Sequence, residues 1–147
     1  MSTEPKSDPL SNVMIDIDTE LSPIKSTFDF SYGSIWFSPG IERLVSERSS
    51  KFIQFVTKRI KSHCTGDWGH SIGSSDNARG IERSSELSDC DWNNIAIKNY
   101  MGEETRYPKY KIVTSTYPID ESQEFMWIQT TLNLSEVTTR IFIGYEH

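Results

Sequence analysis

Three stretches of alternating apolar and polar residues near the end of the chain constrain its fold more than any other feature. They cover residues 110–117, 124–132 and 138–145, and each is rich in β-branched and aromatic side chains. Only short turn-forming segments, 118–122 and 133–136, separate them. The sequence therefore predicts an antiparallel meander, which we expect to be the most regular part of the protein.

Two runs near the start of the chain also have the pattern of strands. Residues 13–18 pass from an apolar run into alternation, and residues 27–32 alternate aromatic with small or polar side chains. A bend or bulge is expected at Gly33, before residues 34–37 continue the second run. Residues 1–11 contain little that could be buried, so we expect a disordered tail followed by a single domain at residues 12–147.

Helical periodicity occupies the middle of the chain. Ser38 and Pro39 form a helix-start signal, and a second start at Ser49 or Ser50 leads into a run of apolar residues at helical spacing that stops before Gly66. Residues 71–89 are expected to form a long polar loop and residues 89–100 a short helix. We expect an α+β domain, in which an antiparallel sheet of about five strands packs against two or three helices.

A turn of sequence Gly66-Asp67-Trp68-Gly69 follows the second helical run. Its glycines permit backbone angles that other residues avoid, Asp67 can bond the local backbone, and Trp68 offers a large apolar surface with one donor. We favour a structural role, with Trp68 docked on the sheet and Asp67 capping the turn. Direct contact of these two side chains with a ligand is the alternative.

The charge of the chain limits the class of partner. The 147 residues carry 15 Lys and Arg against 21 Asp and Glu, a net charge of −6, which argues against a general nucleic-acid binder. The basic set Lys58, Arg59 and Lys61 is then best interpreted as a solvated helix face. An anion or nucleic-acid patch is the alternative, in which the protein would be a DNA- or RNA-binding regulator. On charge alone, a soluble acidic domain is the favoured interpretation, and an acidic surface that meets a basic partner is the alternative.

Cellular location follows from the distribution of apolar residues and cysteines. No apolar run approaches the roughly 20 residues that a membrane-spanning helix needs. The two cysteines do not form a dense disulfide framework, and no signal peptide is recognised at the start of the sequence. We therefore expect a cytoplasmic protein that does not contact a membrane.

Several short motifs occur in a defined order between about Pro39 and Tyr145. They are Ser38-Pro39-Gly40, His63-Cys64-Thr65-Gly66-Asp67-Trp68-Gly69, Asn93 with Ala96, Ser115-Thr116-Tyr117, Trp127-Ile128 and Thr138-Thr139. This order resembles a family of small plasmid- and phage-encoded proteins of unknown function, often labelled plasmid-related proteins. The resemblance implies an accessory protein of a mobile element. We expect it to bind a host or mobile-element protein, with inhibition of a host defence system as the specific hypothesis.

The chain also departs from the pattern of that family. The segment 70–91 is longer than usual, and Tyr100 stands where a glycine is expected after the short helix. Residues 129–136 replace a characteristic acidic turn that contains Asp-Arg-Ser. If that turn binds a ligand in the family, the activity of this chain is lost or altered.

Tryptophan side chains are the main candidates for contact with a partner, because tryptophan is enriched in binding hot spots. The candidate binding residues are Trp36, Trp68 and Trp92, together with Asp67, and Trp127 is a further tryptophan that would qualify if exposed. No phosphate-binding glycine loop is present, and no cofactor is expected.

An enzymatic alternative rests on Asp16 and Asp18. Residues 12–19 resemble the first acidic motif of proofreading-type exonucleases, in which two carboxylates on one strand hold divalent metal ions. A metal-dependent nuclease or phosphodiester hydrolase is therefore the competing hypothesis. Solvent-facing aspartates on an edge strand are the simpler interpretation.

A zinc site is a further alternative, because His63, Cys64, His70 and Cys90 are the residue types that zinc prefers. No paired spacing such as Cys-x-x-Cys supports it, and adjacent His63 and Cys64 would be awkward ligands. An arrangement of Cys64, His70 and Asp67 as nucleophile, base and orienting acid is weaker still, because such groups usually converge from distant segments.

Overall fold

A computed structural model describes residues 9–69, 87–119 and 124–146 of the chain. Within these residues there are α-helices, β-strands and two short 3-10 helices. In chain order they are α1 (Pro9–Leu21), η1 (Ser22–Thr27), β1 (Ser34–Phe37), α2 (Pro39–Cys64), α4 (Asp89–Tyr100), β2 (Ile112–Pro118), β3 (Phe125–Leu132), β4 (Val137–Ile143) and η2 (Gly144–Glu146).

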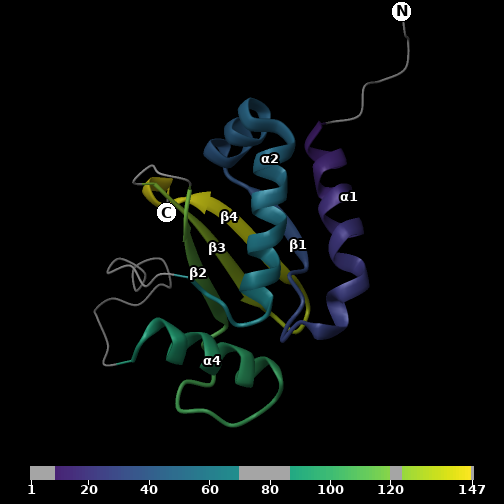
Figure 1. The fold of residues 1–147 in the computed structure, drawn as a ribbon. Coiled ribbons are helices and arrows are strands. Elements are labelled where there is room, and N and C mark those ends of the chain that lie inside the picture. Colours follow the sequence, from purple (N-terminus) through teal and green to yellow (C-terminus); the bar gives the residue numbers. More distant parts are fainter. Residues whose placement is uncertain (1–8, 70–86, 120–123, 147) are drawn as a thin grey trace, which may run out of the picture.

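The strands form one mixed sheet with the order β1-β4-β3-β2 (Figure 1). Strands β2, β3 and β4 pair antiparallel, so the predicted C-terminal meander is confirmed. Strand β1 pairs with β4 in parallel. The α+β class is confirmed, but the expected antiparallel sheet of about five strands is corrected to a mixed sheet of four described strands. No hairpin joins β1 to β4, so no tight turn forces these two strands to be antiparallel.

Residues 13–18 belong to helix α1, so the prediction of a strand there was wrong. Val13, Ile17 and Leu21 are all buried, and their spacing of four residues places them on one face of a helix. A short apolar run is compatible with the periodicity of a strand and with that of a helix. Contact with α2 favours the helix here. Residues 27–32 also lie outside the sheet, although Phe30 and Tyr32 are buried in the core.

Helix α2 has the two starts that the sequence predicts. Ser38 is its N-cap, and its hydroxyl accepts a hydrogen bond from the backbone N–H of Ile41 at 3.3 Å. Ser49 interrupts the helical geometry with φ of 53°, and a second helical stretch follows. The helix ends at Cys64, shortly before Gly66, as expected.

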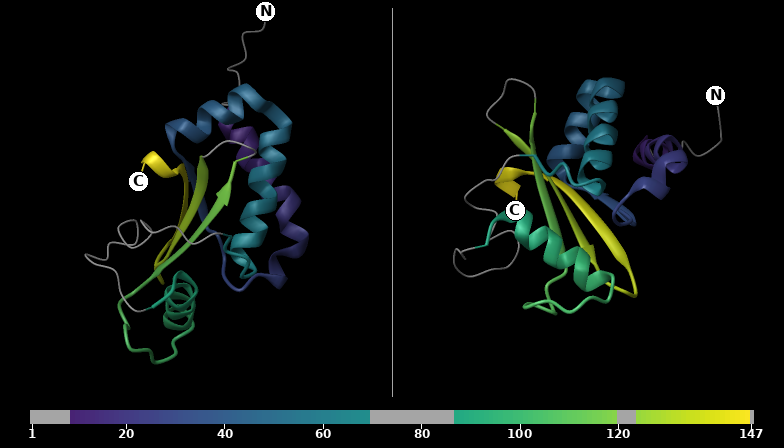
Figure 2. Two further views of the ribbon diagram at one scale, coloured as in Figure 1. Left: turned by 60° about the vertical axis from the view of Figure 1, so that its left-hand side comes forward. Right: turned by 60° about the horizontal axis from the view of Figure 1, so that its bottom comes forward.

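Helices α1 and α2 lie together on one side of the sheet, while α4 lies beside β2 on the side away from α2 (Figures 1 and 2). The main core lies between α2 and the sheet. Its fully buried members include Ile41, Val56, Ile60, Ile128 and Ile141.

Two sequence expectations concern residues outside the described ones. Residues 1–8 of the expected tail are outside them, and α1 begins at Pro9. Residues 70–86 of the expected loop are also outside the described part of the chain. The helix expected at 89–100 is confirmed as α4.

Candidate functional site

The residues of the sequence motif meet at the outer edge of β2. His63 in the last turn of α2 is fully buried, with its ring nitrogens close to two hydroxyl groups of the sheet. Nδ1 lies 2.5 Å from Ser115 Oγ, and Nε2 lies 2.8 Å from Thr130 Oγ1. The network continues to Thr139, whose Oγ1 is 2.7 Å from that of Thr130 and donates to the carbonyl oxygen of Tyr32 at 2.5 Å.

The direction of these hydrogen bonds assigns the tautomer of a neutral His63. A carbonyl oxygen only accepts, so the Thr139 hydroxyl donates to Tyr32 and accepts from Thr130. Thr130 then accepts from His63 Nε2–H, which leaves Nδ1 to accept from Ser115. His63 therefore links the end of α2 to three strands, and both ring nitrogens are used in doing so.

The Gly66-Asp67-Trp68-Gly69 turn docks against the free edge of β2. Trp68 is half-buried, its Nε1 donates to the carbonyl of His63 at 3.0 Å, and its own carbonyl accepts from Thr116 N–H at 3.1 Å. The Asp67 carbonyl accepts from the Tyr117 hydroxyl at 2.6 Å. A Cβ on Gly69, where φ is 74°, would lie only 1.9 Å from Thr116 O.

Asn93 of α4 completes the cover of the same edge. It is fully buried; its Nδ2 donates to Thr114 O at 2.8 Å, and its Oδ1 accepts from Thr114 N–H at 2.9 Å. A single amide side chain therefore satisfies both backbone groups of Thr114, as a neighbouring strand would. The motif residues His63, Trp68, Gly69 and Asn93 all have structural partners at this edge.

A cleft of about 370 Å³ lies beside the turn. Its lining comes from three segments, namely residues 66–69, 88–90 and 114–116. Ser88 and Asp91 form a capping box at the start of α4. The cleft carries the exposed carboxylate of Asp67 and the exposed thiol of Cys90, so it presents polar groups of the turn and helix to solvent.

The four residues considered for zinc do not form a described metal site. The ring of His63 is engaged as above, and burial, followed by the charge of Asp29, raises the pKa of the adjacent Cys64 to about 12. Cys90 is exposed on α4, and His70 lies outside the described residues. Among the described residues, no group of three or more His, Cys, Asp and Glu side chains could hold a metal ion.

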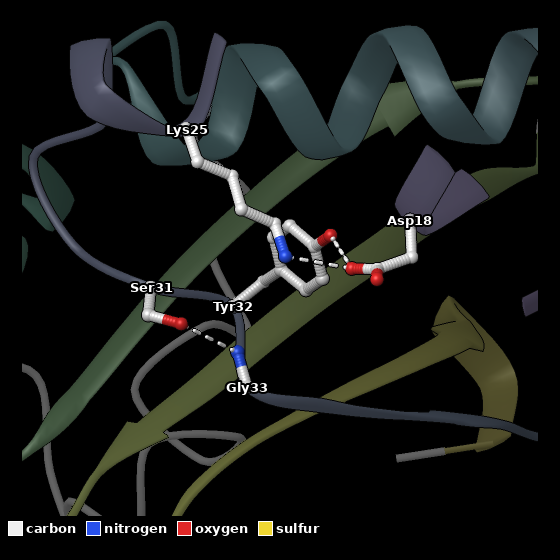
Figure 3. Close-up of polar contacts among 5 residues, drawn as sticks. All are labelled: Asp18, Lys25, Ser31, Tyr32 and Gly33. Atoms are coloured by element: carbon white, nitrogen blue, oxygen red, sulfur yellow. Dashed lines mark hydrogen bonds and ion pairs between the residues drawn. The ribbon is translucent and has the colours of Figure 1, made fainter. Parts of the chain in front are cut away.

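Asp16 and Asp18 do not form the carboxylate pair expected of a nuclease. Both lie on helix α1, where residues two apart point in different directions, so the shared strand face does not exist. Figure 3 shows that one carboxylate oxygen of Asp18 instead accepts hydrogen bonds from the side chains of Lys25 and Tyr32. Lys25 Nζ is 2.7 Å away, and Tyr32 donates its hydroxyl.

These contacts stabilise the charged form of Asp18. The hydrogen bond from Lys25, and after it that from Tyr32, lowers the pKa of the Asp18 carboxyl. Burial, and then the bond to Asp18, raises the pKa of Tyr32 to about 12. The Asp18 carboxylate, with Lys25 and Tyr32 as its two donors, therefore holds α1 against the segment that leads into β1.

A groove of about 360 Å³ runs between α1 and β1, and we name it the α1–β1 groove. It is lined by Met14, Ile15 and Asp18 of α1 and by residues 32–35. The side chain of Ile15 is 61% exposed at this groove. Trp36 of β1, 65% exposed, lies next to the lining residue Ile35 in the same strand.

The other expected contact residues differ widely in exposure. Trp92 is 5% exposed, and its ring contacts those of Tyr107 and Tyr110 at centroid distances of 4.9 and 4.7 Å. Trp127 is also buried. The three basic residues near the end of α2 differ in their surroundings. Lys58 and Lys61 are exposed to solvent. The Arg59 guanidinium lies over the rings of Phe55 and Tyr117.

The sequence analysis missed Glu146. Its carboxylate accepts hydrogen bonds from the Ser38 hydroxyl at 2.6 Å, Gly40 N–H at 3.0 Å and Ile143 N–H at 2.8 Å. Burial alone would raise the pKa of Glu146, but these donors, led by Ser38, keep it below its ordinary value. Ser38 and Glu146 are more than 100 residues apart, so no local pattern could reveal that they meet at the start of α2.

The described part of the chain contains no helix that is both long enough and apolar enough to cross a membrane. Comparisons of the chain with protein-family models, curated proteins and solved structures found no match.

Proposed function

We propose that this chain is an accessory protein of a mobile genetic element that acts by binding another protein. The observation that carries the proposal is the outer edge of β1, which no described strand covers and which lies between the α1–β1 groove and the exposed ring of Trp36. Unpaired strand edges beside apolar side chains are recognised by an added strand from a partner.

The backbone geometry indicates which groups of β1 are available. Ser38 N–H donates to Ile141 O across the parallel pair with β4. Backbone groups of successive residues point alternately to the two sides of a strand, so Trp36 also faces β4. Ile35 and Phe37 direct their N–H and C=O groups outward, and within the described residues β1 has no strand neighbour other than β4.

The side chains around this edge suit an extended peptide with alternating contacts. Ile35 and Phe37 pack toward the core, while Trp36 projects to the other face of the sheet. Successive side chains of an added strand would enter the α1–β1 groove near Ile15 and then meet Trp36. One bound strand could therefore bury the two most exposed apolar side chains of this region.

Charge and resemblance favour a particular kind of partner. The net charge of −6 suits a basic protein, such as a nucleic-acid-binding component of a host defence system. The resemblance to plasmid- and phage-encoded proteins supports the same assignment. Inhibition of a defence nuclease is the specific form of this proposal.

The test is a pull-down with the intact chain from a lysate of the bacterium that carries the gene. The parent chain and a Trp36→Ala, Ile15→Glu variant would be compared, with Met101→Glu as a matched control because Met101 is 67% exposed and directly follows α4, which packs on β2 at the other edge of the sheet. We expect the parent and the control to recover the same stoichiometric partner. The double variant should lose it, because a buried aromatic anchor contributes about 2 kcal/mol or more.

Two results would contradict the proposal. One is recovery of no stoichiometric protein from the host lysate. The other is a partner that the Trp36→Ala, Ile15→Glu variant binds as tightly as the parent, which would place the interface elsewhere.

A further inference from the structure

A second surface, far from β1 in the sheet, combines aromatic rings with positive charge. It is a shallow depression of about 550 Å³ beside the segment that connects α4 to β2. We name it the α4–β2 depression; its lining residues are Trp92, Arg106, Tyr107, Pro108, Lys109 and Tyr110. Trp92 is at its floor, and Tyr107 and Tyr110 are tilted by 49° and 51° against the indole.

The connecting segment is held in place independently of its aromatic side chains. Asn99 Nδ2 donates to the carbonyls of Tyr107 at 2.8 Å and Tyr110 at 2.7 Å, and its Oδ1 accepts from the Thr105 hydroxyl at 2.5 Å. Tyr110 N–H also donates to Tyr107 O at 3.1 Å. The rings therefore stand on a backbone that is already ordered, which lowers the entropy lost when a ligand binds.

Charge around the α4–β2 depression is opposite to that of the chain as a whole. Arg106 and Lys109 are exposed at its rim, and the Arg106 guanidinium lies 5.6 Å from the centre of the Tyr107 ring. Residues 98–111 contain four Lys and Arg against two Glu, within a chain of net charge −6. A ligand with flat rings and negative charge fits this combination.

We propose that the α4–β2 depression binds single-stranded nucleic acid. A base would stack on the exposed parts of the tyrosine rings, while Arg106 and Lys109 contact the neighbouring phosphates. Aromatic grooves also receive proline-rich peptides. A cationic rim offers such a peptide no complementary charge, whereas it is what a phosphate backbone requires.

The test measures fluorescence anisotropy of a labelled oligothymidylate of about 12 nucleotides with the full chain, starting at about 50 mM salt. Arg106→Glu with Lys109→Glu is compared with a matched control of equal charge change, Lys58→Glu with Lys61→Glu, whose side chains are exposed on α2. A third variant, Tyr107→Ala, removes one ring but leaves its carbonyl bond to Asn99. Circular dichroism verifies that each variant is folded.

We expect the Lys58→Glu, Lys61→Glu control to bind the oligonucleotide nearly as tightly as the parent, with only the small loss that the added negative charge causes. The Arg106, Lys109 variant should lose binding, and Tyr107→Ala should weaken it about fivefold or more. With two phosphate contacts, the logarithm of affinity should fall with the logarithm of salt concentration at a slope of about −1.4.

Three results would overturn the proposal. The first is no binding by the folded parent at the lowest salt. The second is equal loss in the α2 control, which would show that only overall charge matters. The third is a proline-rich peptide that shifts the tryptophan fluorescence under conditions where the oligonucleotide does not bind.

Discussion

At the scale of single residues, a few buried or half-buried polar side chains join segments that are distant in sequence. His63 joins α2 to three strands through hydroxyl groups, and Glu146 joins the end of the chain to the start of α2. Each of these side chains has several hydrogen-bond partners, which offsets the free energy lost when a polar group leaves water. Such residues make the arrangement of the elements specific.

Replacement of Glu146 by Gln should destabilise the protein in a pH-dependent way. Because the folded-state pKa of Glu146 is lowered, its charge contributes stability above the unfolded pKa, near the ordinary value of 4.5, and this contribution is lost as pH falls through the folded pKa. We expect the variant to be less stable by about 1 kcal/mol at neutral pH, with the difference shrinking in acid.

Urea unfolding followed by circular dichroism at several pH values would measure this difference. Glu136→Gln, in the exposed turn between β3 and β4, is the matched control and should change little. A difference for Glu146→Gln that grows in acid would have the wrong sign and would refute the role of its charge.

At the scale of elements, the outer edge of β2 explains why the turn and α4 have their particular residues. An uncovered strand edge offers backbone groups to other chains, and here Trp68, Gly69 and Asn93 cover it. The same sheet has an opposite edge at β1, without such cover in the described residues. The two edges therefore differ in their capacity to accept a partner.

Asn93→Asp tests whether the Asn93 amide on α4 protects the outer edge of β2, because the substitution barely changes the shape of the side chain. The carboxylate can still accept from Thr114 N–H, but it cannot donate to Thr114 O, so two acceptors face each other in a buried place. We expect a loss of about 2 kcal/mol in the free energy of unfolding and faster hydrogen exchange at Thr114. Asn94→Asp, which is exposed and adds the same charge, should have a much smaller effect; equal effects would contradict this role.

Gly69→Ala tests the close approach of the turn to β2. Gly69 and Gly102 both have positive φ, of 74° and 81°, so alanine strains the backbone at each by roughly 1 kcal/mol. Only at Gly69 would the added Cβ meet another atom, Thr116 O at 1.9 Å, whereas nothing lies within 4 Å at Gly102. Thermal unfolding should therefore show Gly69→Ala to be clearly the less stable variant, and similar melting temperatures would argue against the docked turn.

At the scale of the whole molecule, the two cysteines report whether the core between α2 and the sheet is closed. Cys64 is fully buried with its pKa raised to about 12, while Cys90 is exposed on α4. Under native conditions a thiol reagent should modify Cys90 rapidly and Cys64 only as the protein unfolds, because the thiolate is the reactive form. Rapid modification of both thiols in the folded chain, or of Cys64 in a Cys90→Ser variant, would show that the core is open.

Elements whose signals are local could be predicted from the sequence. The alternation in β2, β3 and β4, the serine cap of α2 and the glycine after α2 each act within a few residues, and these predictions are confirmed. The same reasoning failed for residues 13–18, where a short apolar run fits both a strand and a helix and packing against α2 decides.

Three arrangements could not be predicted and became visible in the folded chain: the parallel pairing of β1 with β4, the assembly of motif residues along β2, and the contacts of Asp18 with Lys25 and Tyr32. These arrangements depend on hydrogen bonds and burial between segments that are far apart in the chain. The free energy that fixes them comes from long-range contacts, which leave no periodic pattern within any single segment. For this reason the sequence showed the residues of the motif, but the structure showed that they secure the β2 edge of the sheet, whereas no described strand covers the β1 edge.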